Sequence, residues 1–123
     1  MLAPEFTIAV VDDDDGVRRA LGRLLRSLAC EPVLFASGEA FLESLASSQP
    51  DCVVLDLHMS NLTGMDVMAE LQVRGVAVPT IILTGHDETG MRKRCLGAGA
   101  VGFLTKPVQR ASLSAALESV SLI

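Results

Sequence analysis

Short apolar runs rich in β-branched residues alternate along the chain with segments whose apolar residues recur every three or four positions. Apolar runs of about five residues are typical of strands that are buried on both faces of a parallel sheet. The runs that fit this description are residues 6–11, 32–36, 52–55, 80–84 and 101–105. We therefore predict five β-strands.

The segments between these runs predict five helices. After the first run, Val17, Leu21, Leu24 and Leu28 recur at the spacing of one helix face. The later segments repeat the pattern with four apolar sets: Phe41, Leu42 and Leu45; Met65, Met68 and Leu71; Met91, Cys95 and Ala98; and Leu113, Ala116, Leu117 and Val120. Strict alternation of strands and helices predicts an α/β fold, a doubly wound five-stranded parallel sheet with five helices.

Composition and charge narrow the class of protein. Half of the 123 residues are hydrophobic and a fifth are charged, which is typical of one globular domain spanning residues 1–123. The apolar runs are too short to span a membrane, and the first residues lack a signal-peptide pattern, so we expect a cytoplasmic protein. The three cysteines lack the spacing of a metal site, and we expect them to be reduced thiols in the core. The formal net charge of −5 argues against nucleic acid as a direct partner of this chain.

Polar residues gather where the predicted strands end. Asp12 and Asp13 follow the first strand, Asp56 follows the third, and Thr84 ends the fourth. Lys106 follows the fifth strand. The carboxyl ends of parallel strands lie at one edge of a doubly wound sheet, and ligands bind at that edge. We therefore expect these five side chains to converge.

Three carboxylates at one edge of a sheet repel one another. At ~4 Å and an effective dielectric constant of ~20, each like-charged pair costs on the order of 4 kcal/mol, so the cluster must be partly protonated or must bind a cation. Oxygen ligands with room for water and phosphate suit Mg²⁺ better than a complete calcium cage. With Asp56 at the centre of the sheet, the chemistry that this set favours is attack of its carboxylate on phosphorus, which gives an aspartyl phosphate.

Each of these residues has a simpler interpretation when it is taken alone. A single Asp at a strand end is usually a helix cap or a turn residue, and the same caution applies to Thr84 and Lys106. We assign the capping role to Asp14 and Asp15, which begin the next helix, where carboxylates accept free backbone N–H groups and face the positive end of the helix dipole. The joint placement of the other polar residues at four strand ends is what points to chemistry.

Four motifs stand in an order and spacing that identify a family. They are VVDD at 10–13, VVLDLHM…G at 53–64, IILTGH at 81–86 and GAVGFLTKP at 99–107. On these motifs the chain resembles the receiver domain of bacterial two-component response regulators, in particular the FixJ-like subgroup, from residue 8 to about residue 120. The resemblance implies the flavodoxin-like receiver fold.

The resemblance also implies a role for each residue of the predicted acidic cluster. Asp56 would be the phosphoacceptor, Asp13 would bind Mg²⁺ directly, and Asp12 would act largely through water. Asp56 itself and the backbone carbonyl of His58 would complete the protein ligands. In this family Mn²⁺ can substitute for Mg²⁺.

Further residues of the resemblance concern the response to phosphorylation. Thr84 would hydrogen-bond one phosphoryl oxygen and Lys106 would pair with another. Phe103 stands at the position of the aromatic switch residue, which turns inward when the threonine moves. The Lys106–Pro107 peptide is expected to be cis, an isomer that is accessible to X–Pro bonds.

The function that the resemblance implies is a phosphorylation-controlled signalling switch. A sensor histidine kinase would phosphorylate Asp56 in a Mg²⁺-dependent reaction, and a conformational change would relay the signal to a partner or to a DNA-binding transcriptional output domain that this chain lacks. Such a domain is not an enzyme in the usual sense, because it catalyses only its own phosphotransfer and autodephosphorylation. A homodimer could form through the face made by the fourth helix, the fifth strand and the fifth helix.

Two residues depart from the family pattern, and several charged residues have more than one possible role. Ser60 replaces a usual proline and predicts a more flexible loop, and Val108 replaces a frequent aromatic and predicts a looser start of the fifth helix. His58 and His86 occupy positions that tune aspartyl-phosphate hydrolysis, or they are exposed loop residues without a role. The basic residues of two helices are either solvated or contact a kinase or a second copy: Arg19, Arg23 and Arg26 in the first helix, and Arg92, Lys93 and Arg94 in the fourth.

Two other function classes use some of the same residues. A Mg²⁺-dependent phosphatase with an aspartate nucleophile, such as the haloacid dehalogenase group, needs an Asp-x-Asp pair, whereas this chain reads Asp56-Leu57-His58. A receiver-like module that binds a partner without phosphorylation would not need the complete set of acids, threonine and lysine. Turnover of phosphate esters and phosphorylation by acetyl phosphate separate these classes from the switch.

Overall fold

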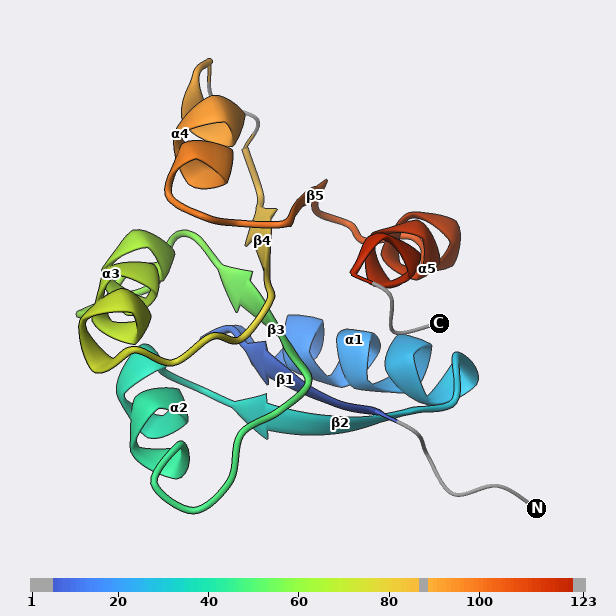
Figure 1. Ribbon diagram of the computed structural model, residues 1–123. Coiled ribbons are helices and arrows are strands. Elements are labelled where there is room, and N and C mark those ends of the chain that lie inside the picture. Colours follow the sequence, from blue (N-terminus) through green and yellow to red (C-terminus); the bar gives the residue numbers. More distant parts are fainter. Residues whose placement is uncertain (1–5, 87–88, 121–123) are drawn as a thin grey trace.

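The computed structural model describes residues 6–86 and 89–120 and contains one parallel sheet with helices on both faces (Figure 1). The strands are β1 (Phe6–Val11), β2 (Cys30–Phe35), β3 (Cys52–Asp56), β4 (Thr80–Thr84) and β5 (Gly102–Thr105), and the helices are α1 (Asp15–Ser27), α2 (Gly38–Ser44), α3 (Gly64–Arg74), α4 (Met91–Gly97) and α5 (Arg110–Ser119). The strand order is β2-β1-β3-β4-β5. This architecture confirms the predicted fold class.

The boundaries of the elements depart from the prediction by at most two residues at the strands. β1 and β4 have the predicted bounds, whereas β2 begins at Cys30 because Cys30 and Glu31 continue the pairing with β1. Apolar runs alone did not predict this extension, because Glu31 is polar. The last apolar residue of four predicted helices caps the helix rather than belonging to it: Leu28, Leu45, Ala98 and Val120.

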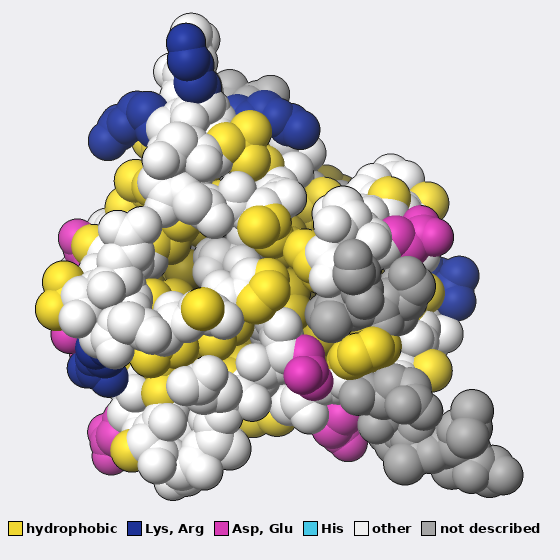
Figure 2. Space-filling view, viewed as in Figure 1, with side chains coloured by type: hydrophobic (Ala, Val, Ile, Leu, Met, Phe, Trp, Pro, Cys, Tyr) yellow, Lys and Arg dark blue, Asp and Glu magenta, His cyan; other side chains and the backbone are white. Residues whose placement is uncertain are grey.

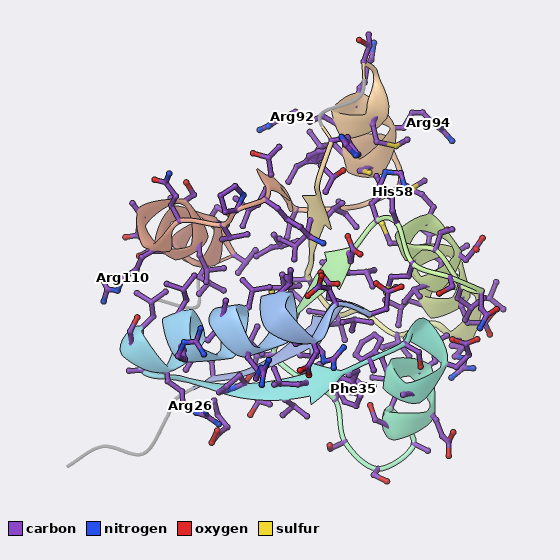
Figure 3. The ribbon with its side chains drawn as sticks, turned by 180° about the vertical axis from the view of Figure 1, so that it is seen from behind. Arg26, Phe35, His58, Arg92, Arg94 and Arg110 are labelled. Atoms are coloured by element: carbon purple, nitrogen blue, oxygen red, sulfur yellow. The ribbon has the colours of Figure 1, made fainter. Side chains whose placement is uncertain are left out.

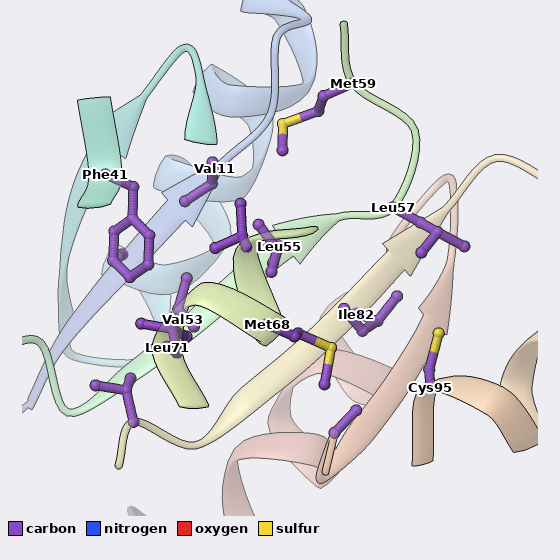
Figure 4. Packing of buried hydrophobic residues seen from close by; sticks show 14 of the residues in the cluster. Val11, Phe41, Val53, Leu55, Leu57, Met59, Met68, Leu71, Ile82 and Cys95 are labelled. Atoms are coloured by element: carbon purple, nitrogen blue, oxygen red, sulfur yellow. The ribbon is translucent and has the colours of Figure 1, made fainter. Parts of the chain in front are cut away.

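Two separate hydrophobic cores cover the two faces of the sheet. On one face, Ala9 and Val11 of β1 pack in a cluster with residues of α2, α3 and α4, such as Phe41 (Figure 4). On the other face, Ile8 and Val10 pack in a cluster with residues of α1 and α5. Because neighbouring residues of one strand point to opposite faces, both faces need apolar side chains, which explains the continuous apolar runs.

The cysteines belong to these cores. Cys30, Cys52 and Cys95 are all buried and free. Burial raises the pKa of the Cys52 thiol to about 12. The structure therefore agrees with their interpretation as core thiols, since a thiol that stays protonated is a weak nucleophile and metal ligand.

The helices differ in how their first turns are secured. Asp14, Ser37 and Thr63 accept a backbone N–H at the starts of α1, α2 and α3. The N-cap residues of α4 and α5 are Gly90 and Gln109, and the described residues provide no side-chain cap at either helix. The longest of these helices has 13 residues. Within the ranges that the structure describes, no helix has the length and apolar character needed to cross a membrane.

The register of the strands brings their carboxyl ends to one edge of the sheet. Val11 lies beside Leu55, and Asp56 lies beside Leu83. Thr84 lies beside Thr105, the last residue of β5. The residues at or just after these positions therefore share one rim.

Gly64 allows α3 to begin directly against this rim. A Cβ atom at Gly64 would lie 2.7 Å from the Asp56 carbonyl oxygen and 2.9 Å from the Leu57 Cα. Both neighbours are backbone atoms at the end of a buried strand, so they cannot move aside as a flexible side chain could. The close approach of α3 to the end of β3 therefore requires glycine.

We expect Gly64→Ala to lower the free energy of unfolding by about 1–3 kcal/mol, the usual cost of overpacking a site that cannot relax. Gly97→Ala is the control, because Gly97 is likewise a terminal residue of a helix, the last of α4, and a Cβ there would meet no atom within 4 Å. The free energy of unfolding of that variant should be unchanged or slightly higher, since alanine has a higher helix propensity than glycine. Urea unfolding of both variants measures the difference, and equal stabilities would contradict the packing argument.

Candidate functional site

The rim brings together the three predicted acidic residues. Asp12, Asp13 and Asp56 each offer a carboxylate oxygen, and these atoms lie within 4.8 Å of one another. Asp12 and Asp56 are 0% and 3% exposed, whereas Asp13 is exposed. The sequence placed these residues at strand ends, and the parallel register accounts for their convergence.

Lys106 lies between the two buried carboxylates. Its Nζ atom is 2.8 Å from Asp12 Oδ2 and 3.3 Å from Asp56 Oδ1. The Lys106 backbone N–H donates to the Thr84 carbonyl oxygen at 2.8 Å, which continues the β4–β5 pairing for one residue. The peptide between Lys106 and Pro107 is cis, as expected. Through its two ion pairs, Lys106 thus links the end of β5 to the ends of β1 and β3.

Burial and mutual repulsion shift the protonation of this cluster. Burial and the negative charge of Asp12 raise the pKa of Asp56, although Lys106 and the His58 backbone N–H oppose the shift. Burial alone would lower the pKa of Lys106, but its contacts with Asp12 and Asp56 outweigh that effect and raise the pKa. One ammonium group therefore compensates only part of the negative charge of the cluster.

The donor set of the cluster fits a hard divalent cation. Three carboxylates supply oxygen ligands only, which Mg²⁺ prefers. Asp12 Oδ2 is buried and accepts no hydrogen bond in good geometry from the described residues, although the Lys106 ammonium lies close to it. Such a site is short of positive charge and of hydrogen-bond donors, so a cation would complete it. The predicted ligand role of the His58 carbonyl stays a prediction.

Asp13 is held from the opposite loop. Ser60, which follows β3, places its backbone N and its Oγ each 3.4 Å from Asp13 Oδ2. The sequence predicted only greater flexibility from this replacement of proline, which the structure does not test. No sequence pattern predicted the contacts between Ser60 and Asp13, because they depend on the path of the loop.

The Thr84 hydroxyl is engaged with its own loop. It donates to the His86 carbonyl oxygen at 2.7 Å and accepts the His86 backbone N–H at 3.1 Å. Thr84 is fully buried, and the His86 side chain is exposed. The expected contact of Thr84 with a phosphoryl group would require this pair of hydrogen bonds to rearrange.

Phe103 occupies the core on the α4 side of the sheet. Its side chain is 8% exposed and packs in the same cluster as Cys95 of α4. The Arg92 guanidinium lies over the ring, with its Cζ atom 5.7 Å from the ring centroid. Figure 3 shows Arg92 and Arg94 extending to opposite sides of α4. The ring is thus buried in this structure, and its role as a switch stays a prediction.

Arg18 also contacts the acidic cluster, and the sequence did not predict this contact. Its Nη1 donates to the Asp12 carbonyl oxygen at 2.7 Å, and its Nη2 pairs with Asp15 Oδ1 at 2.8 Å. The only available signal was its position three residues after Asp15, the spacing of one helix face. Asp14 accepts the Val17 N–H at 3.0 Å, which confirms its predicted capping role.

The pKa shift of Asp56 leads to a prediction about stability. Because the folded protein raises the pKa of Asp56, it keeps a proton at pH values where the unfolded chain has lost it. Its free energy of unfolding therefore falls as the pH rises from the ordinary pKa of an aspartate to the raised pKa. Asp56→Asn should abolish this loss and make the metal-free protein more stable than the wild type at neutral pH.

Urea unfolding in EDTA, from about pH 4 to about pH 8, measures both effects. Glu118→Gln is the control, because Glu118 is an exposed acid on α5. A variant Asp56→Asn that is less stable than the wild type at neutral pH would contradict the repulsion described here.

Known proteins resemble this chain in sequence. The sequence pattern of the response regulator receiver domain matches residues 8–118. Response regulator protein TmoT of Ectopseudomonas mendocina is 35% identical over 115 residues, which are 94% of this chain and 52% of TmoT. Transcriptional regulatory protein FixJ of Bradyrhizobium diazoefficiens is 35% identical over 112 residues, which are 91% of this chain and 55% of FixJ. The chain thus spans about half the length of the curated relatives it matches.

Solved structures extend the similarity to the backbone. A crystal structure of FixJ-N has a TM-score of 0.86 at 30% identity and covers 94% of this chain and 93% of that chain. A response regulator receiver protein from Burkholderia phymatum has a TM-score of 0.83 at 38% identity and covers 95% of this chain and 96% of that chain. Sequence and backbone similarity over nearly the whole chain show that it belongs to the family of response regulator receiver domains, with FixJ among its relatives.

Proposed function

We propose that this chain is a phosphorylation-controlled switch that accepts a phosphoryl group on Asp56 from a sensor histidine kinase. The observation that carries the proposal is the Asp56 carboxylate at the rim, with Lys106 on one side and two further aspartates within metal-binding distance. Membership of the receiver family supplies the signalling context. The chain would be a single receiver unit of a longer pathway and not a conventional enzyme.

In the transfer step, an Asp56 oxygen attacks phosphorus of a phosphohistidine. The new O–P bond forms as the N–P bond breaks, and the histidine nitrogen keeps the bonding electron pair. Lys106 stands 3.3 Å from Asp56 Oδ1, so its ammonium would stay beside the added phosphoryl oxygens and compensate their charge. Hydrolysis of the aspartyl phosphate would return the domain to its first state.

Asp12, Asp13, Asp56 and the His58 carbonyl are the groups that would hold Mg²⁺, or Mn²⁺ in its place. A divalent ion there supplies charge neutralisation for the phosphoryl oxygens. Neighbouring groups hold Asp12 in place: the Asp14 N–H donates to Asp12 Oδ1 at 2.9 Å, and Lys106 pairs with Asp12 Oδ2. The site would therefore be arranged before the phosphoryl donor arrives.

The response to phosphorylation would pass through Thr84. Its hydroxyl bonds to the His86 backbone, and reaching a phosphoryl oxygen would release those groups of the β4–α4 loop. Phe103 lies on the next strand, with Arg92 of α4 over its ring. A change at Thr84 would thus reach α4 and β5, the two elements next to the site on this side.

The partners of the switch are proposed from its surface and its relatives. The α4–β5–α5 face would contact an output domain or a second copy of the chain. Figure 2 shows basic side chains over α4, where Arg92, Lys93 and Arg94 are exposed. On α1, Arg19, Arg23 and Arg26 are exposed and could meet the kinase. A transcriptional output in the cytoplasm would agree with relatives named transcriptional regulatory proteins.

We expect acetyl phosphate with Mg²⁺ to add one phosphoryl group to the wild-type chain and none to Asp56→Asn. The substitution removes the nucleophilic oxygen and keeps the shape of the side chain. Intact-mass spectrometry measures the product. An unchanged wild-type mass would favour a module that only binds a partner, and multiple turnover of small phosphate esters would favour a phosphatase.

We expect millimolar Mg²⁺ to raise the unfolding temperature of the wild type, because a cation relieves the repulsion among the carboxylates. At ten times the dissociation constant, the gain is about 1.4 kcal/mol, which corresponds to about 5 °C for a domain of this size. Thermal unfolding with and without Mg²⁺ measures the shift. Asp13→Asn should show a much smaller shift, and an equal shift in both proteins would argue against this metal site.

A further inference from the structure

The loop between β3 and α3 is fixed at both ends by backbone contacts. The Leu57 N–H donates to the Leu83 carbonyl at 2.8 Å, and the Gly64 N–H donates to the Leu57 carbonyl at 3.0 Å. Thr63 begins α3 with a reciprocal pair of hydrogen bonds to Asp66. Asn61 turns the chain with a φ of 65°. The position of Ser60 is therefore set by the path of the loop.

From this position Ser60 reaches across the rim to Asp13. Its backbone N–H and its hydroxyl both point to Asp13 Oδ2, each at 3.4 Å. The two residues lie 47 positions apart in the chain. The contacts join the β1–α1 loop, which carries Asp12 and Asp13, to the β3–α3 loop, which carries His58.

The three carboxylates of the cluster differ in how they are held. Asp12 is buried between the Asp14 N–H and Lys106, and Asp56 is buried beside Lys106. Asp13 is exposed, and the hydrogen bonds that the described part of the chain gives to its carboxylate come from Ser60. An exposed carboxylate must lose side-chain freedom before it can bind a cation, and any group that orients it in advance lowers that cost.

We propose that Ser60 is a positioning residue that orients the Asp13 carboxylate for a divalent cation. The inference rests on the metal site of the proposed function. A carboxylate oxygen can accept a hydrogen bond while the other oxygen of the group binds a metal, and ligating carboxylates are commonly oriented in this way. Ser60 uses Oδ2 and leaves Oδ1 for the cation.

The residue type at position 60 decides whether these contacts can form. Proline, which the resemblance gives as the usual residue at this position, has neither a backbone N–H nor a hydroxyl. Alanine keeps the N–H and loses the hydroxyl. Threonine keeps both groups. Three substitutions therefore separate the two contacts without changing any proposed metal ligand.

The test measures the Mg²⁺ dissociation constant of the purified chain by isothermal titration calorimetry. Loss of a group that orients a metal ligand typically weakens binding by about 10- to 100-fold, and because both contacts are long we expect about three- to tenfold for Ser60→Ala. Ser60→Pro should weaken binding at least as much, and Ser60→Thr should stay within about twofold of the wild type. The metal-free unfolding temperature of Ser60→Ala should not change.

Ser48→Ala is the matched control, because Ser48 is an exposed serine that precedes β3 at the opposite edge of the sheet. An unchanged or tighter Mg²⁺ affinity in Ser60→Ala, with normal binding by the wild type, would overturn this inference alone. Equal weakening by Ser60→Thr would also overturn it, since threonine keeps both donors. A wild type that binds no Mg²⁺ would instead overturn the metal site itself.

Discussion

The ion pairs of Lys106 with Asp12 and Asp56 are the interaction on which the site depends. Two carboxylates that are almost fully buried would be costly without a positive charge, and Lys106 supplies one at 2.8 and 3.3 Å. With Asp13, three carboxylates and one ammonium leave a formal charge of −2 when all are ionised. This deficit equals the charge of one divalent cation, so the arrangement of charges at the rim would favour a divalent cation there.

The parallel sheet is the second constraint, because it brings distant residues to one edge. The acids come from the ends of β1 and β3, and the lysine comes from the end of β5. The central strands β3 and β4 are buried along their whole length and apolar between their first and last residues, so their polar chemistry can lie only at their ends. Gly64 matters for the same reason: α3 can begin against the end of β3 only if no Cβ atom intervenes. The fold thus limits chemistry to a rim and requires close backbone packing beside it.

The sequence predicted most of this rim, since strand ends can be located from apolar runs. Asp12, Asp56 and Lys106 were placed together because they end strands of one parallel sheet. The supporting contacts could not be predicted in this way. Arg18 reaches the Asp12 carbonyl, and Ser60 reaches Asp13, only because of the paths of two loops and the rotamers of two side chains. Neither loop path follows from hydrophobic periodicity, and the burial of Phe103 likewise depends on packing against α4.

The capping of the helices has a consequence for mechanics. The helices α1, α2 and α3 each begin with a side-chain cap, whereas the described residues provide none for α4 and α5. A side-chain cap typically stabilises a helix by about 1 kcal/mol. Among the described residues, the first turns of α4 and α5 therefore lack a stabilising contact that the first turns of α1, α2 and α3 have. A change at the rim that moved a helix would meet less local resistance at the start of α4 or α5 than at the start of α1, α2 or α3.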